Sequence, residues 1–147
     1  MFRGRHEHTI DKKGRLSIPA GFRTELQIRG SRPPILTNYK KHLALYARED
    51  WEVIEQDLLA KSQMRPDVRK YTRFVVGGAM ECPIDNQGRI LVPPQLRQHA
   101  KLKSKVMLTG VLDKIEIWDS KLFEEDQLET MDNMEDIELS VDASSAI

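Results

Sequence analysis

The chain of 147 residues contains a single cysteine, Cys82, which excludes an intrachain disulfide and fits a reducing cytoplasm. Its neighbours Glu81 and Pro83 offer no activating base, so we interpret Cys82 as structural. No stretch approaches the ~20 consecutive apolar residues that a membrane-spanning helix needs. Residues 1–6 lack the apolar core of a signal peptide. These absences predict a soluble, cytoplasmic protein.

The sequence also lacks the short motifs of common catalytic and cofactor sites. It has no Gly-rich phosphate loop, no Gly-x-Ser-x-Gly, no His-Glu-x-x-His and no zinc cluster. His6 and His8 would share one face of a strand, but no Cys or carboxylate accompanies them at metal-ligand spacing. We therefore predict no enzyme activity, and no metal, cofactor or small-molecule substrate.

Charge is unevenly distributed along the chain. The formal net charge is zero, with 23 basic and 23 acidic residues. All of the Lys and Arg residues lie within residues 1–123, whereas residues 124–147 contain nine acidic residues and no Lys or Arg. Such asymmetry is typical of a basic binding body with an acidic tail, and a basic face is the electrostatic footprint of a nucleic-acid binder. The alternative is a surface that is basic but only solvated.

One ten-residue pattern occurs twice, at residues 10–19 and 84–93. In each copy an apolar residue precedes an Asp, two polar residues, a Gly and an Arg. Apolar residues follow one and three places after the Arg, and a Pro ends the pattern. The repeat continues into Phe22-Arg23 and Leu96-Arg97. Because a repeat of this kind indicates one supersecondary unit used twice, we predict a duplicated fold.

The Asp-x-x-Gly part of each copy predicts a tight turn. Asp11 and Asp85 can accept hydrogen bonds from the backbone N–H groups that follow them, and Gly14 and Gly88 tolerate positive φ. The alternating apolar residues after the turn predict a short strand with one buried face. The Arg then stands at the start of this strand, with its charge directed away from the core. It either pairs with the Asp across the turn or contacts a ligand, and its repetition in a basic body favours a ligand.

The remaining periodicities predict mainly β structure with short helices, an α+β fold. We expect hairpins near residues 35–46 and 107–118, short helices at 20–26 and 95–100, and a helix after each hairpin. A linking helix should begin at Pro66-Asp67. The tail should form a frayed acidic helix that passes into disorder. The predicted divisions are a first unit at 1–60, the linking helix at 61–78, a second unit at 79–123 and the acidic tail at 124–147.

The two motifs together resemble the MraZ family of bacterial transcription regulators. The first match runs from Met1-Phe2-Arg3-Gly4 through the first motif to Phe22-Arg23. The second includes Ala79-x-Glu81, Asp85-x-x-Gly88-Arg89-Ile90, Pro93-x-x-Leu96-Arg97 and Glu116-Ile117-Trp118. The resemblance covers residues 1–123, and the acidic tail matches no motif of the family.

The resemblance implies an AbrB-like swapped-hairpin fold, with two units related by a pseudo-twofold axis in a β-barrel. It also implies a ring-shaped homo-oligomer that binds short repeats in double-stranded DNA ahead of its own cell-division and cell-wall operon. Such a protein would be cytoplasmic and associated with the nucleoid. An alternative that the residues leave open is a purely structural ring-forming protein, in which the arginines make salt bridges between subunits.

The candidate site residues follow from the repeated turn and the basic residues near it. The first copy has Lys12-Lys13 where the second has Asn86-Gln87, so we expect the first turn to be the main DNA contact. The candidate DNA-binding residues are Arg3, Arg5, Lys12, Lys13, Arg15 and Arg89, and the turn-supporting residues are Asp11, Gly14, Asp85 and Gly88.

Overall fold

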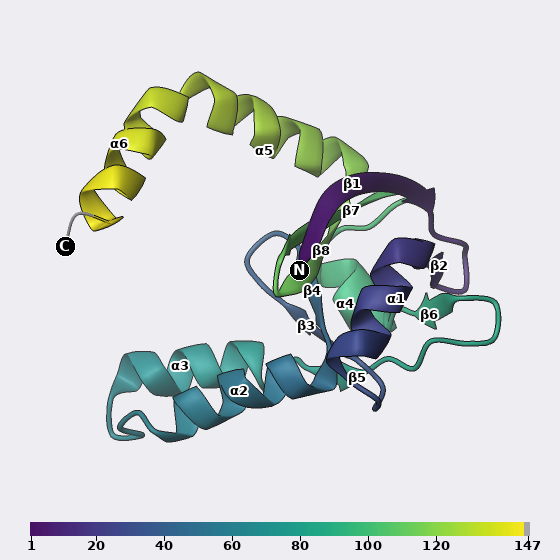
Figure 1. The fold of residues 1–147 in the computed structure, drawn as a ribbon, viewed down its shortest axis with the longest axis horizontal. Helices are drawn as coiled ribbons and strands as arrows, with labels where there is room; N and C mark the ends of the chain where they lie inside the picture. Colours follow the sequence, from purple (N-terminus) through teal and green to yellow (C-terminus); the bar gives the residue numbers. More distant parts are fainter. Residues whose placement is uncertain (146–147) are drawn as a thin grey trace.

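A computed structural model describes residues 1–145, which form an open antiparallel sheet with helices around it (Figure 1). The six strands of this sheet lie in the order β1-β7-β8-β4-β3-β5. Their bounds are β1 Phe2–Thr9, β7 Lys105–Leu112, β8 Lys114–Asp119, β4 Leu43–Tyr46, β3 Ile35–Asn38 and β5 Met80–Glu81. The prediction of an α+β fold is confirmed.

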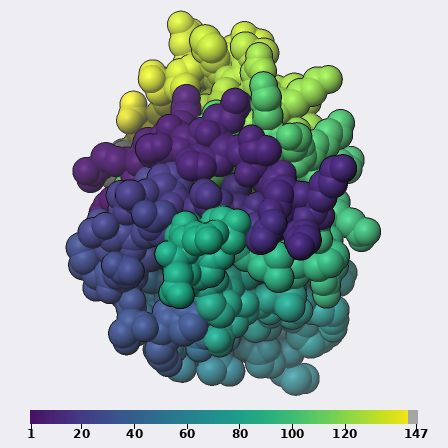
Figure 2. All heavy atoms as spheres, turned by 90° about the vertical axis from the view of Figure 1, so that its right-hand side faces the viewer, coloured from purple at the N-terminus to yellow at the C-terminus, as the bar shows by residue number. Residues whose placement is uncertain are grey.

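A separate two-stranded ribbon is formed by β2 (Arg15–Ser17) and β6 (Arg89–Leu91). These two strands come from the two copies of the repeated motif. Leu16 and Ile90, which hold the same place in the two copies, lie directly opposite each other. Figure 2 looks onto the side of the molecule that carries the ribbon, and shows the N-terminal segment adjoining the segment around residues 80–100 at the surface.

The expected closed β-barrel is wrong for these residues. β1 pairs with β7 on one side only, and β5 pairs only with β3, so the sheet ends in two edges that do not meet. β5 consists of two residues, which is too short to continue the sheet toward β1. The strands β2 and β6 pair with each other instead of joining the large sheet. The structure is therefore an open sheet with a separate ribbon.

Pairing between the two halves of the chain holds the fold together. β1 pairs with β7 over eight residue pairs, while β4 pairs with β8 and β3 with β5. The main core combines side chains from both copies of the motif, and Leu16, Ile18, Ile90 and Val92 are each no more than 1% exposed. A smaller cluster includes Trp51 and joins the helical part of the first half to the sheet. The main core is therefore shared by the two halves, whereas the buried residues of the smaller cluster all lie in the first half.

The described residues form six helices outside the sheet. They are α1 (Ala20–Arg29), α2 (Arg48–Leu59), α3 (Pro66–Val75), α4 (Pro94–His99), α5 (Ser120–Asp132) and α6 (Met134–Ser145). α2 and α3 form a projecting helical pair, and α5 and α6 extend from another part of the molecule (Figure 1). None of the described helices is long and apolar enough to cross a lipid bilayer.

The acidic tail is more helical than the sequence predicted. α5 begins at Ser120, where the Asp119 side chain accepts the backbone N–H of Leu122 at 3.3 Å and caps the helix. The helix continues past the predicted tail boundary, and α6 reaches Ser145 where disorder was expected. Met134, Ile137 and Val141 follow helical spacing in α6, and all three side chains are exposed. Residues 146–147 lie outside the described residues.

Candidate nucleic-acid interface

The first Asp-x-x-Gly segment forms a closed turn. Asp11 Oδ1 accepts the backbone N–H of Lys13 at 3.0 Å and that of Arg15 at 2.9 Å. The Gly14 N–H donates to the Asp11 carbonyl at 3.0 Å, and Gly14 has a φ of 91°. A side chain is disfavoured at that φ, which explains the glycine. The carboxylate therefore fixes the backbone from which Arg15 projects.

The second segment repeats this geometry. Asp85 Oδ1 accepts the backbone N–H of Gln87 at 2.8 Å and that of Arg89 at 2.9 Å. Gly88 donates to the Asp85 carbonyl at 3.0 Å and has a φ of 77°. Equal spacing in the sequence thus produces equal turns.

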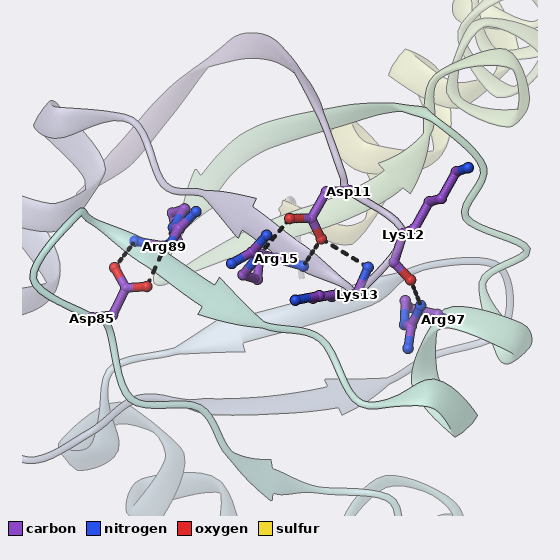
Figure 3. Close-up of polar contacts among 7 residues, drawn as sticks. All are labelled: Asp11, Lys12, Lys13, Arg15, Asp85, Arg89 and Arg97. Atoms are coloured by element: carbon purple, nitrogen blue, oxygen red, sulfur yellow. Dashed lines mark hydrogen bonds and ion pairs between the residues drawn. The ribbon is translucent and has the colours of Figure 1, made fainter.

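Each Asp also holds the guanidinium of its own Arg. Arg15 Nε donates to Asp11 Oδ2 at 2.6 Å, and Arg89 Nε donates to Asp85 Oδ2 at 3.3 Å (Figure 3). The pKa of each Asp is lowered, chiefly because the carboxylate accepts the backbone N–H of that Arg. Both carboxylates therefore stay ionised at neutral pH, and the pairing across the turn persists there.

This pairing leaves the outer edge of each guanidinium available. Within residues 1–145, Nη1 and Nη2 of Arg15 and Arg89 make no hydrogen bond, since each guanidinium bonds its Asp through Nε. Those two nitrogens form the fork that binds a phosphate, or O6 and N7 of guanine, at two points. Pairing with the Asp and contact with a ligand are thus compatible roles for each Arg, because the Asp binds Nε and leaves the Nη fork free.

The ribbon presents these arginines on one face. Arg15 lies opposite Leu91, and Ser17 lies opposite Arg89. Directly paired residues of an antiparallel ribbon share a face, so these four side chains form one surface, which we call the ribbon face. Its arginine side chains are 40% and 27% exposed. The opposite face carries the buried Leu16 and Ile90.

Arg23 and Arg97 were not assigned a role from the sequence, although the repeat includes them. Arg97 Nε donates to the Val92 carbonyl at 3.1 Å, and its Nη1 donates to the carbonyl of Lys12 in the other copy at 3.4 Å. A Cβ on Gly14 would lie 2.8 Å from Arg97 Nε. Arg97 therefore packs against the first turn from the second copy.

Arg23 of the first copy packs against the second turn. Its Nη1 donates to the Ile18 carbonyl at 2.9 Å, and a Cβ on Gly88 would overlap its guanidinium. An Arg of the other copy thus packs against each turn, although the hydrogen bond of Arg23 stays within its own copy. In the sequence, the sign of this role was that a second Arg follows the Arg of the turn by eight residues in both copies.

The other candidate basic residues divide into two groups. Lys12 and Lys13 are exposed at the first turn, where Lys13 lies beside Arg15 and the Lys12 side chain extends away from it (Figure 3). Arg5 lies on β1, where its guanidinium stacks over Phe123 at 5.3 Å and donates to Gln127 Oε1 at 2.7 Å.

Arg3 is exposed two residues before Arg5 on the same strand. The contacts of Arg5 direct its side chain toward α5 and not toward the ribbon. The structure therefore brings Lys12, Lys13, Arg15 and Arg89 together, but not Arg3 and Arg5.

The comparisons with known proteins point to one family. The family model described as "MraZ protein, putative antitoxin-like" matches residues 1–74 and again residues 75–142. A protein of Thermoanaerobacter pseudethanolicus named "Transcriptional regulator MraZ" is 45% identical over 125 residues, which cover 85% of each chain. One of the same name from Shewanella denitrificans is 39% identical over 147 residues, covering 99% of this chain and 94% of the relative. The chain belongs to the MraZ family.

Proposed function

We propose that this chain is a transcriptional regulator that binds double-stranded DNA sequence-specifically through the ribbon face. The observation that carries the proposal is the pair of arginines on that face, each held at Nε by its own Asp with the outer fork free. The family to which the chain belongs contains proteins named transcriptional regulators, which supports the same function.

The ribbon has a shape suited to the major groove, which admits a two-stranded antiparallel ribbon. In this arrangement Arg15 and Arg89 contact guanine edges or phosphates, while Lys12 and Lys13 contact the phosphate backbone. The ribbon strands are short, and a turn packed against an Arg of the other copy precedes each one. Rigid turns favour binding because little side-chain and backbone freedom is then lost on association.

We extend the proposal to the organisation of the protein. The two units at 1–60 and 79–123 are of the AbrB-like swapped-hairpin type, joined by the segment 61–78 and followed by the acidic tail. The protein acts in the cytoplasm on short direct repeats in the promoter region of its own cell-division and cell-wall operon. Exchange of strands between the units, as in the β1–β7 and β3–β5 pairs, supports this proposal.

The first expected result concerns salt. Four basic side chains near the ribbon, each contacting one phosphate, give a slope of log K against log salt concentration of about −3.6 per bound chain. We expect an electrophoretic shift with DNA from upstream of the protein's own gene, and a weaker one with scrambled DNA. A fluorescence titration at several salt concentrations measures the slope. A protein that only builds a scaffold would bind neither duplex at any salt concentration.

The second expected result concerns assembly. We propose that the chains close into a ring, which repeats the ribbon face around its circumference. Several weak contacts then act together on spaced repeats. Affinity should rise far more than twofold when a single site is replaced by repeats about one helical turn, ~10 base pairs, apart. Equal affinity for one repeat and for three, together with a monomeric mass by light scattering, would contradict this assembly.

A further inference from the structure

The two halves of the ribbon face are alike at one position and different at the other. Arg15 and Arg89 hold equivalent places in the two copies. Across the ribbon, Arg15 pairs with the residue two places after Arg89, and Arg89 pairs with the residue two places after Arg15. Those residues are Ser17 in the first copy and Leu91 in the second. The repeat therefore gives the face two identical guanidinium forks but one hydroxyl and one apolar side chain.

Leu91 is an exposed apolar side chain on an otherwise polar face. Its side chain lies opposite Arg15 and is 58% exposed, although the flanking Ile90 and Val92 are fully buried. Its backbone is fixed by the ribbon pairing, and its carbonyl lies 3.7 Å from the Sγ of the buried Cys82, which donates to it. The strand thus holds Leu91 outward in a defined position, next to an arginine fork that is free within residues 1–145.

We propose that Leu91 contacts the 5-methyl group of a thymine in the major groove and so determines part of the sequence specificity. This inference rests on the proposed function. The thymine methyl is the apolar group that the major groove presents, and an apolar side chain is its recognition partner. Ser17, at the equivalent place, offers a hydroxyl, which pairs with a polar base edge.

This difference gives the bound DNA site a direction. A ribbon with Ser at both places, or Leu at both, would read the two halves of its site alike and favour a palindromic sequence. With one of each, one chain distinguishes the two ends of its site. The expected site has a thymine next to the base pair that Arg15 contacts, because Leu91 lies directly opposite Arg15.

A second copy of the chain is the other surface that could cover Leu91, but the ribbon face fits DNA better. Leu91 lies on a face with two guanidinium forks, so the surface that covers it has to offer an apolar group and hydrogen-bond acceptors for both arginines side by side. DNA supplies both an apolar methyl and the anionic acceptors that those arginines need.

The test replaces thymine by deoxyuracil, one position at a time, in the shortest upstream duplex that the wild-type protein binds. This change removes only the methyl group. For the wild-type protein we expect one position at which the affinity falls about fourfold, the value for one buried methyl-sized group. For Leu91→Ser, the thymine and deoxyuracil duplexes should bind equally, with the affinity of the wild type for deoxyuracil.

Two further variants make the test specific. Leu59→Ser makes the same change at a site on α2 that is 69% exposed, and it should keep the full wild-type response to deoxyuracil. Ser17→Leu should become sensitive to methyl removal at a position in the other half of the site. Light scattering reports the oligomeric mass of each variant.

The possible outcomes separate the inference from the function on which it rests. If the wild type binds the duplex but responds to deoxyuracil at no position, or if Leu91→Ser keeps the response, the role of Leu91 is overturned and DNA binding stands. If Leu91→Ser changes the oligomeric mass and leaves the deoxyuracil response intact, Leu91 is a subunit contact. If no duplex binds, both proposals fail.

Discussion

Arg15→Ala should lower the affinity for a specific DNA site by roughly 5- to 160-fold, which corresponds to about 1–3 kcal/mol. The variant loses the free fork of the guanidinium and leaves the Asp11 carboxylate without its cationic partner, close to the DNA. If Arg15 reads a base, the preference at that base should relax. If it contacts only phosphate, binding should weaken evenly across sequences and the salt slope should shrink by about one.

The equivalent change Arg89→Ala should have the smaller effect. The side chain of Arg89 is less exposed than that of Arg15, at 27% against 40%. The uncharged Asn86 and Gln87 stand where the first turn has Lys12 and Lys13. A fluorescence titration of both variants on one duplex, at one salt concentration, measures the difference. Normal binding by Arg15→Ala with loss of binding by Arg89→Ala would show that the second turn is the main contact.

Two controls separate DNA recognition from folding. Asp11 accepts the backbone N–H groups of Lys13 and Arg15 whatever the side chain at position 15, so both alanine variants should keep the turn and the wild-type mass by light scattering. An exposed ion pair contributes little to stability. Arg15→Lys keeps the charge but not the planar fork. If Arg15 contacts phosphate, this variant should keep the salt slope, and if Arg15 reads a base, it should lose the base preference as Arg15→Ala does.

The turns could be predicted from the sequence because their chemistry is local. The contacts of Asp11 reach residues no more than four places away, so spacing alone encodes them. The packing contacts of Arg23 and Arg97 connect residues far apart in the chain, such as Arg97 and Lys12. The repeat marked these arginines as special, but it could not show that each one serves the other copy.

The sheet could be predicted in its parts but not in its assembly. The alternation in residues 15–18 predicts a short strand with Leu16 and Ile18 buried, and both are buried. The pairing of β2 with β6 and the open edges of the large sheet depend on which strands meet. Local sequence patterns do not encode which strands pair. For the same reason the sequence could not show that Arg5 lies away from the ribbon, because its contacts Phe123 and Gln127 are more than a hundred residues away in the chain.

Separating the two halves of the chain should abolish folding. Residues 1–76 and 77–147, expressed individually, should aggregate or, as monomers, show no cooperative thermal transition by circular dichroism. β1 would lose its entire partner β7, and the fragment 1–76 would keep only the β3–β4 pairing. Residues such as Leu16 and Ile90, which are buried against the other half, would be exposed, and an unpaired strand edge promotes aggregation.

Co-expression of the two fragments provides the matched control, because it restores every strand pair without the covalent link after α3. The mixture should yield a soluble complex of both fragments with a cooperative transition. A fragment alone could also form a homodimer, since Leu16 and Ile90 hold equivalent places and one unit could pair with a second copy of itself. Only a soluble fragment that melts cooperatively as a monomer would contradict the conclusion that the two units share one core.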